Sequence, residues 1–347
     1  MMEISDGSSQ GEVVWNKFVR EHYPPVGSFM LAWEWGVFQR SLGRGVEYFF
    51  IKEKKEPIAA FTFVRHQLPL GFSYGYTPRG PVVAARERSQ TLSIFRKIQE
   101  WSREVHPDLI FIRLEPPVDA LGFDAKKEGF DIPGYYVQPR YNHTVPLEGS
   151  DEDMIKRFHP STRSNLARAE RRGVSVMLDA LRGPADYEEF FRMAAETEAR
   201  NKAKNVFPSR VYFDALTKSI LPLGEVSDPN KLSLGIFSGF HGGKPAATHF
   251  VLFFGDTATY LYGAAYTEHL NSKVTTYLHW SAMKEARRRG FKYYDIGGVD
   301  ENRWPSLTTF KRQFGGVEFS YIGNVDIPLR PRLHGAYNLL RKIRRTE

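Results

Sequence analysis

Two stretches of this chain follow the same order of predicted elements, and this internal repeat constrains the fold more than any other feature. The first stretch begins with a hairpin pattern over residues 46–67, where Phe- and Ile-rich runs flank a charged turn that ends at Pro57. A third strand with a turn follows at 71–83, and another strand lies at 109–116. Between them, apolar residues of period 3.6 predict a helix with one buried face, formed by Leu92, Phe95, Ile98 and Trp101.

The second stretch repeats this order about 190 residues later in the chain. It begins with two apolar strands around a Gly/Pro turn at 232–255 and continues with a third strand at 258–266. A helix over 273–289 ends at Gly290, a residue suited to a helix C-terminus, and a strand follows at 292–299. Both stretches then close with a segment that contains a Lys near a Phe and ends in Pro-Leu. The repeat predicts an α/β fold of two mixed-sheet units in tandem.

The connector between the two copies, residues 148–232, has a helical pattern. Ser150 followed by Asp153 predicts a capped helix start, and a second helix begins at the "PSTRSN" segment. A third helical run, from 186 onward, ends before Pro208. None of these runs carries heptads long enough for a coiled-coil arm.

Positive charge is concentrated in two segments. The chain has a net charge of +8, and residues 156–172 and 330–347 each contain six Lys or Arg and a single Glu. Such local clusters indicate contact with phosphates of RNA, of a nucleotide-linked substrate or of an anionic lipid. Solvated helix faces are the alternative interpretation. In the tail, Leu333, Tyr337, Leu340 and Ile343 are expected on one stripe of a helix that docks on the body or lies on a membrane surface.

Several classes of chemistry have no support in the sequence. The chain has no Cys, no phosphate-binding G-x-x-x-x-G-K-[ST] loop and no G-x-S-x-G nucleophile elbow. Its His residues are scattered without metal-ligand spacing, so we expect no metal. The turns before the two repeat helices lack the glycines with which backbone amides hold the pyrophosphate of coenzyme A. No apolar run reaches about 20 residues and the N-terminus is polar, which favours a cytoplasmic protein.

Lys311 is the most unusual charged residue, because Phe310 and Phe314 flank it just before a double-Gly turn. A partly desolvated lysine can stabilise a developing anion or bind a phosphate. An ordinary edge lysine is the alternative. Asp295, ahead of two glycines, and Glu115 end equivalent strands of the two copies, where α/β sites tend to lie. For Asp295, a turn-capping role is the alternative.

Taken together, the motifs "AWEWGVFQR", "IRLEP", "HPSTRSNLARAERRGV", "YLYGAAY", "YYDIGGV", "FKRQFGG" and "YIGNVD" resemble the FemABX family of peptidoglycan-bridge aminoacyltransferases. They occur in the family's order and cover most of the chain. The resemblance implies two tandem GNAT-like domains. The first would span 1–146 with a returning C-terminal segment, 326–347, and the second would span 147–325.

The resemblance also implies a reaction. An amino acid passes from aminoacyl-tRNA to an amine of a peptidoglycan precursor's stem peptide, in a UDP-linked muropeptide or its lipid-linked form. No cofactor is expected, and the chain is expected to act as a monomer. The basic C-terminal helix could bring this cytoplasmic protein to the inner face of the membrane.

The family's functional residues map onto particular positions of this sequence. Lys311 matches the lysine that stabilises charge on the ester and the departing ribose oxygen. The expected substrate contacts include Glu115, which lies at an acidic position that is often Asp in the family. They also include Arg40, because Gln39 occupies the position where some members have Lys and Arg40 is the residue next to it. Arg210 is the nearest substitute for an arginine whose place Pro208 takes. Tyr212 and Tyr262 also match site tyrosines of the family, whereas Asp295 and Phe310 are expected at the site from their own positions, at a strand end and beside Lys311. From charge alone, we expect tRNA or precursor phosphates at Arg163, Arg168, Arg171 and Arg172.

Two further interpretations remain open on sequence alone. A GNAT-type N-acyltransferase with another donor or a non-peptidoglycan acceptor would have the same tandem layout. A binding module that holds RNA or a muropeptide without catalysis is the third, and the combination of Lys311, Asp295 and the strand-end pattern argues against it.

Overall fold

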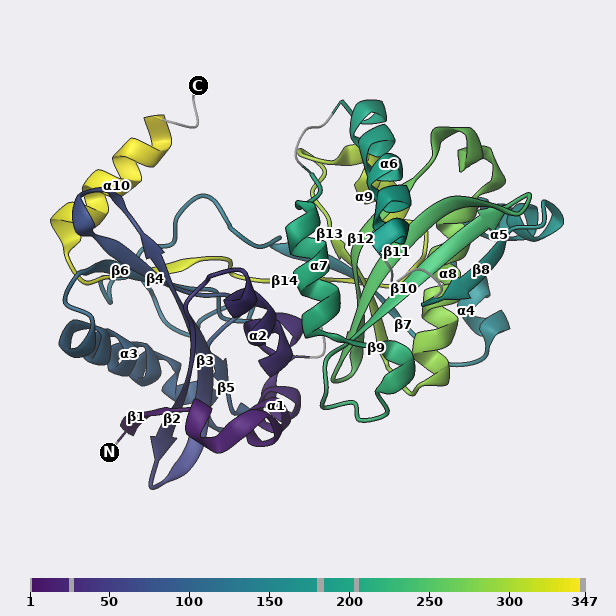
Figure 1. Ribbon diagram of the computed structural model, residues 1–347. Coiled ribbons are helices and arrows are strands. Elements are labelled where there is room, and N and C mark those ends of the chain that lie inside the picture. Colours follow the sequence, from purple (N-terminus) through teal and green to yellow (C-terminus); the bar gives the residue numbers. More distant parts are fainter. Residues whose placement is uncertain (1, 25–27, 180–183, 203–205, 344–347) are drawn as a thin grey trace. The chain divides into compact units, whose positions relative to one another are not determined.

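The structure is a computed structural model that describes residues 2–24, 28–179, 184–202 and 206–343. The chain divides into two compact units, each built on its own mixed sheet (Figure 1). Unit 1 comprises Met1–Pro24, Met30–Arg140 and Ser320–Glu347, and unit 2 comprises Pro25–Phe29 and Tyr141–Phe319. Among the described helices, none combines the length and apolarity required to cross a bilayer.

Unit 1 is built on a sheet of order β1-β2-β3-β4-β6-β15, with β5 paired to β3. Neighbouring strands are antiparallel except β4 and β6, which run parallel. The hairpin β2–β3 turns at Lys54 and Lys55, which both have positive φ, as a two-residue hairpin turn requires. The strands are β1 (Met2–Asp6), β2 (Val46–Glu53), β3 (Glu56–Gln67), β4 (Ser73–Thr77), β5 (Val82–Val83), β6 (Leu109–Leu114) and β15 (Val325–Pro328).

Helix α3 packs in the core of unit 1. Its apolar face buries Phe95 and Ile98 completely, against β-strand residues such as Phe61 and Ile112. Strand β6 also contacts helix α10. The helices of this unit are α1 (Gly11–His22), α2 (Trp33–Ser41), α3 (Thr91–Val105) and α10 (Pro331–Ile343).

Unit 2 repeats this architecture with a sheet of order β14-β7-β13-β12-β11-β10-β8, and β9 pairs with β10. Strands β12 and β13 run parallel, and so do the short β9 and β10. The hairpin β10–β11 turns at Gly242 and Gly243, which again have positive φ. The strands are β7 (Tyr141–Pro146), β8 (Ser175–Leu178), β9 (Leu221–Pro222), β10 (Ser233–His241), β11 (Lys244–Phe254), β12 (Thr257–Ala265), β13 (Tyr293–Gly298) and β14 (Val317–Ser320).

Helix α8 is the central helix of unit 2. It packs on β10 and β11, and its Leu278 and Met283 are fully buried in the core. It ends before Gly290, whose φ of 85° continues the chain in the left-handed region, as the sequence predicts. The helices of this unit are α4 (Asp151–Arg157), α5 (Pro160–Arg171), α6 (Pro184–Arg200), α7 (Arg210–Ser219), α8 (Val274–Arg288) and α9 (Pro305–Arg312).

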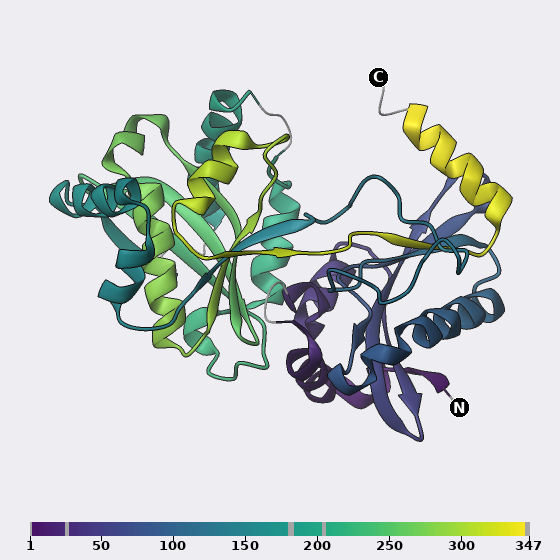
Figure 2. The same cartoon turned by 180° about the vertical axis from the view of Figure 1, so that it is seen from behind.

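Each sequence copy contributes its closing strand to the sheet of the other unit. Strand β7, which ends the first copy, pairs with β13 in unit 2, and β15, which ends the second copy, pairs with β6 in unit 1. Figures 1 and 2 show this exchange, with the teal β7 among green strands and the yellow β15 beside the blue β6. Because of this pairing, residues 141–146 and 320–325 fall on the other side of the domain boundaries expected from the sequence.

Most predicted elements are present, and the tandem mixed α/β architecture is confirmed. The capped start of α4 is also confirmed, since the Ser150 side chain accepts from the Asp153 amide and the Asp153 carboxylate accepts from the Ser150 amide.

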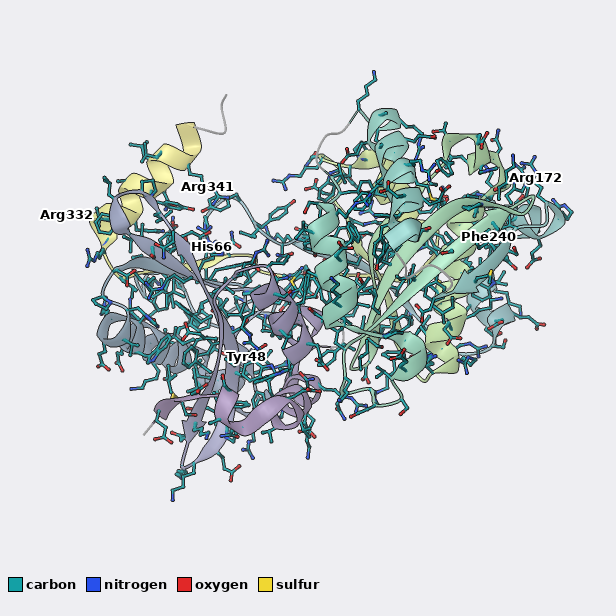
Figure 3. All side chains as sticks on the ribbon, in the orientation of Figure 1. Tyr48, His66, Arg172, Phe240, Arg332 and Arg341 are labelled. Carbon is teal, nitrogen blue, oxygen red and sulfur yellow. The ribbon has the colours of Figure 1, made fainter. Side chains whose placement is uncertain are left out.

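The expected apolar stripe on the C-terminal helix is wrong in part. In α10, Tyr337 packs on Phe111, but Leu340 is 62% exposed. Residues at positions three and four apart share a helix face, and the packed face here passes through His334, Tyr337 and Arg341. The side chain of Ile343 lies outside the described residues. Figure 3 shows the side chains of this helix with Arg332 and Arg341 labelled.

Candidate active site

The parallel strands β12 and β13 stop pairing at the middle of unit 2. They pair from Thr257 and Tyr293 as far as Thr259 and Asp295. Beyond that point β13 continues alongside β7, with a register shift between Asp295 and Gly297 that identifies a β-bulge. The carboxyl ends of parallel strands are where α/β folds place their ligands, and a bulge redirects the side chains beside it.

Asp295 holds the turn that follows this bulge. Its carboxylate is completely buried and accepts hydrogen bonds from the backbone N–H of Gly297 and the side-chain amide of Asn142, each at 2.8 Å. The turn-capping role considered for Asp295 is therefore present. Gly297 has a φ of 94°, a conformation that L side chains rarely adopt, so the turn requires glycine.

Lys311 reaches this turn from helix α9. Its side chain is 6% exposed, and its Nζ donates a hydrogen bond of 2.6 Å to the carbonyl oxygen of Gly298. A Cβ atom at Gly297 would lie 3.2 Å from the same Nζ. Lys311 is thus a buried residue of a short helix rather than an edge lysine.

Burial changes the proton affinity of Lys311. Desolvation lowers the pKa of its ammonium to about 8, and the nearby carboxylate of Asp295 opposes this shift. At neutral pH the lysine therefore remains largely protonated while its proton is held less tightly than in water. A buried ammonium of this kind can donate to, and stabilise, an oxyanion.

A cluster of buried rings lies beside Lys311. Phe310 and Phe314 pack on each other with centroids 5.4 Å apart, and both contact His279. His279 also contacts His249, and its Nδ1 lies 3.0 Å from the hydroxyl of Tyr294. Burial lowers the pKa of His279 well below its usual value, and the charges of His249 and Lys311 lower it further. The imidazole is therefore neutral at physiological pH.

Two tyrosines expected at the site lie together in unit 2. The hydroxyl of Tyr262, on β12, lies 3.1 Å from the hydroxyl of Tyr212, on α7. Arg210, at the start of α7, forms an ion pair with Glu188 and lies over the ring of Phe191. Tyr262 lies on β12, the strand whose pairing with β13 ends at Asp295, close to Lys311.

Glu115 occupies the corresponding strand end in unit 1. Its side chain is 3% exposed, and its carboxylate accepts from the Tyr76 hydroxyl at 2.6 Å and from the Gln138 amide at 3.1 Å. Its backbone N–H donates to the carbonyls of Thr77 and Gly80. The strand end of β6 in unit 1 therefore carries a buried, hydrogen-bonded carboxylate.

Arg40 lies on α2 of unit 1. Its guanidinium donates to the carbonyl of Val46 at 3.1 Å and lies over the rings of Trp33 and Tyr48. Figure 3 labels Tyr48 within this unit. These contacts orient Arg40 by packing as well as by charge.

The four arginines of the predicted phosphate cluster divide into two pairs. Arg163 donates to backbone carbonyls at the end of α4, and Arg172, labelled in Figure 3, donates to the carbonyl of Asn271. The side chains of Arg168 and Arg171 are exposed on α5 and have no hydrogen-bond or ion-pair partner among the described residues. The second pair is the one available to an external phosphate.

One group of side chains in the described parts of the chain has metal-like spacing: Asp131, Asp326 and His334 in unit 1. Asp326 already accepts two hydrogen bonds, each of 2.7 Å, from the fully buried guanidinium of Arg113. This guanidinium supplies the positive charge that a cation would bring. The group therefore fits an internal ion pair better than a metal site.

Sequence reasoning missed Asn142 and the two buried histidines. The "YNHTVPL" strand gave no indication that Asn142 faces Asp295, 153 residues away in the chain. His249 and His279 occur singly in apolar segments, where a histidine resembles any other core residue.

Comparisons with known proteins agree with this geometry. Residues 159–312 match an acetyltransferase (GNAT) domain, and residues 12–131 match the FemAB family. The lipid II:glycine glycyltransferase of Staphylococcus haemolyticus (strain JCSC1435) is 22% identical, over 94% of this chain and 93% of that protein. The fold and these matches define an aminoacyltransferase built from two GNAT-type units.

Solved structures show the same fold along the whole chain. The crystal structure of FemX superposes with a TM-score of 0.78 at 18% identity, and covers 97% of this chain and 100% of that one. A tandem GNAT protein from the clavulanic acid biosynthesis pathway superposes with a TM-score of 0.52 at 11% identity, over 95% and 99% of the two chains. The FemAB match over residues 12–131 and the similarity to FemX agree with the resemblance that the motifs indicated.

Proposed function

We propose that this protein transfers an amino acid from aminoacyl-tRNA to an amine of a peptidoglycan precursor. The observation that carries the proposal is the buried ammonium of Lys311 at the split between β12 and β13. The names of the relatives, lipid II:glycine glycyltransferases, support a peptidoglycan acceptor.

The reaction needs a nucleophile, a carbonyl and a leaving oxygen. The neutral amine of the precursor attacks the ester carbonyl that joins the amino acid to the tRNA 3′ end, and a C–N bond forms. The ester C–O bond then breaks, and the ribose oxygen leaves with the proton that the amine gives up. The negative charge passes from the carbonyl oxygen to the ribose oxygen, so one well-placed cationic donor can stabilise both.

Lys311 is the proposed donor to these oxygens. Its Nζ makes a hydrogen bond to Gly298 and carries further N–H groups, because an ammonium has three donors. Desolvation strengthens its interaction with a developing oxyanion. Phe310, next to Lys311 in α9, is the proposed apolar wall on the donor side.

Each unit, taken by itself, carries proposed precursor contacts. Tyr212 and Tyr262 offer paired hydroxyls in unit 2, and Arg40 offers a cation in unit 1. Arg210 is available to the precursor if it exchanges its ion pair with Glu188. Glu115, in unit 1, and Asp295, in unit 2, are each buried and hydrogen-bonded, which supports a role in fixing the structure around them rather than direct contact with a large substrate.

Unit 2 also carries the proposed tRNA contact. Arg168 and Arg171 project from α5, and Arg163 and Arg172 flank them with guanidinium groups tied to the backbone. Phosphate contacts of this kind contribute affinity that does not depend on nucleotide sequence.

The precursor is proposed to be lipid-linked, with the UDP-linked muropeptide as the alternative form. A lipid-linked acceptor requires the protein, proposed to be a cytoplasmic monomer, to meet the inner face of the membrane. Helix α10 supports this contact, because it exposes Leu339 and Leu340 together with Arg332.

A reconstituted assay tests the function. Purified protein is offered several aminoacyl-tRNAs against UDP-linked and lipid-linked precursors, and the products are weighed by mass spectrometry. The proposal expects a precursor heavier by one aminoacyl residue, with no product when acetyl-coenzyme A replaces the tRNA. Product formation from the thioester alone would instead identify an ordinary N-acyltransferase.

A further inference from the structure

Strand β7 touches the Lys311 site although it comes from the first sequence copy. Its Asn142 is paired in register with Gly298, the residue whose carbonyl accepts the lysine hydrogen bond. Asn142 is 7% exposed and donates through its side chain to Asp295. One residue of this strand therefore contacts both the backbone and the carboxylate that surround the ammonium.

We infer that Asn142 is a positioning residue for Lys311, acting through Asp295 and the turn at Gly297 and Gly298. This inference rests on the proposed function only for its kinetic consequences, because the geometry itself is independent of the substrate. Asn142 touches none of the reacting atoms. Its side-chain amide fixes one oxygen of the Asp295 carboxylate, and the other oxygen holds the Gly297 N–H.

The bulge explains why such a clamp is needed. Asp295 pairs with Thr144 and Gly297 pairs with His143, so Ile296 is the extra residue in the ladder. This local break rotates the strand and turns the Gly298 carbonyl toward α9. A broken ladder has fewer hydrogen bonds to fix its geometry, and the bond from Asn142 to Asp295 replaces part of what is missing.

The same strand also holds the segment that follows Lys311. His143 donates from its Nε2 to the carbonyl oxygen of Gly315 at 2.6 Å. A Cβ atom at Gly316 would lie 2.2 Å from the carbonyl oxygen of Thr144. Consecutive residues of β7 thus fix the turn beneath Lys311 and the turn after its helix.

The charged groups around the ammonium are few, so the effect of Asn142 can be isolated. Asp295 on β13 raises the pKa of Lys311, while His279 on α8 is kept neutral by burial. Burial also lowers the pKa of His143 on β7. On the solvent side, Glu318 of β14 and Arg312 of α9 pair with each other.

Removal of the Asn142 amide frees the Asp295 carboxylate to rotate or to take up a proton. Either change weakens the attraction that keeps a proton on Lys311, and the pKa of the lysine falls. The lysine also loses its fixed position. In kinetic terms, kcat should fall on the order of 10- to 100-fold, because small displacements of a reacting group have large effects. The KM values for both substrates should stay within about twofold, since no substrate contact is removed.

The experiment compares Asn142→Leu and the smaller Asn142→Ala with the wild-type chain. The first measurement is independent of activity: trace acetylation with acetic anhydride across a pH series, with the peptide that carries Lys311 quantified by mass spectrometry. We expect the pH midpoint of Lys311 labelling to be lower in both variants than in the wild type. The Asp295→Asn variant, which removes the carboxylate charge itself, should shift the midpoint in the same direction. The second measurement is the pH profile of kcat, whose alkaline limb should move in the same direction.

Asn324→Leu is the matched control, because Asn324 is also a buried asparagine, 1% exposed, whose side chain donates to a backbone carbonyl in unit 1. Its labelling midpoint should equal that of the wild type. An unchanged midpoint in folded Asn142→Leu and Asn142→Ala protein overturns the inference. Absence of transfer by the wild-type chain with every donor overturns the proposed function instead, and the labelling result still decides the role of Asn142.

Discussion

The Nζ of Lys311 lies 2.6 Å from the carbonyl oxygen of Gly298, although the side chain that carries this charge is almost completely buried. A buried ammonium with a single strong acceptor is costly to the folded state, and it persists because Asp295 lies close by. Residues that destabilise a fold in this way are concentrated at functional sites.

The substitution Lys311→Met should separate function from stability. Transfer should fall on the order of 10²- to 10³-fold, the effect of removing an oxyanion donor. The melting temperature should stay the same or rise, because replacing a buried charge by an apolar side chain is often neutral or stabilising by about 1–4 kcal/mol. Steady-state kinetics and thermal unfolding of one preparation test both parts. Turnover equal to that of the wild type would exclude the catalytic role.

The pH dependence of transfer should show the titration of Lys311. Its ammonium is the active form, and its pKa is lowered to about 8, so log(kcat/KM) should decline as pH rises through that value. Deprotonation of the acceptor amine raises kcat/KM as pH rises, because the amine must lose its proton before it can attack. The measurement is a kcat/KM profile from about pH 6 to 10, compared with Asp295→Asn, whose decline should begin at lower pH. A profile that keeps rising to the upper end would contradict the requirement for a protonated lysine.

The stability of the fold should respond to pH in the same range. Since the folded-state pKa of Lys311 is lower than its ordinary value of 10.5, the unfolded chain binds more protons between about pH 8 and 10.5. This residue therefore contributes stability that increases as pH rises through that window. Chemical denaturation at several pH values should show the increase in the wild type, and a smaller one in Lys311→Met.

Gly297→Ala should damage the site more than an exposed glycine substitution of the same kind. The residue has a φ of 94°, and its new Cβ would lie 3.2 Å from Nζ of Lys311. The backbone strain alone is about 1–3 kcal/mol, and the ammonium must also move. Gly173→Ala is a suitable control, because Gly173 also has positive φ, at 68°, but has open space around its Cβ position. Comparable kcat values in the two folded variants would show that the turn does not set the position of the lysine.

Much of the fold was predictable because it depends on local patterns. The hairpins follow from their turn residues, and α8 follows from its period and from Gly290. The exchange of closing strands was not predictable, since nothing in the short sequences of β7 (YNHTVP) and β15 (VDIP) assigns either strand to one sheet. Choosing between them depends on tertiary packing, which strand propensity does not encode.

The same distinction applies to the site. Lys311 and Asp295 stood out by their neighbours in sequence, and the structure places them together. Asn142 could not be found in this way, because its register position and its hydrogen bond to Asp295 arise in a sheet built from distant segments. The burial of Lys311 likewise arises from the packing of α9 and not from the residues next to it.

The arginines of α5 should determine the salt dependence of tRNA binding. Arg168 and Arg171 are exposed and have no partner among the described residues, so neutralising them should leave the fold unchanged. The plot of log affinity against log salt should become shallower by about 2 in Arg168→Gln/Arg171→Gln. The control is Arg192→Gln/Arg288→Gln, which removes two exposed arginines that are paired with glutamates on α6 and α8. The same slope in both double variants would place the tRNA contact elsewhere.

Helix α10 should determine any attachment to an anionic membrane. Leu339 and Leu340 are 61% and 62% exposed, whereas the opposite face is fixed to unit 1 by Tyr337 on Phe111. Apolar residues beside cations insert at the headgroup boundary, and two leucines together give weak, reversible binding that depends on lipid charge. We expect Leu339→Gln/Leu340→Gln to reduce co-sedimentation with phosphatidylglycerol vesicles while transfer to a UDP-linked precursor is unchanged. The control, Val13→Gln/Val14→Gln, removes an exposed apolar pair from α1 of the same unit. Equal sedimentation of the wild type and the α10 variant would mean that this helix serves only to complete unit 1.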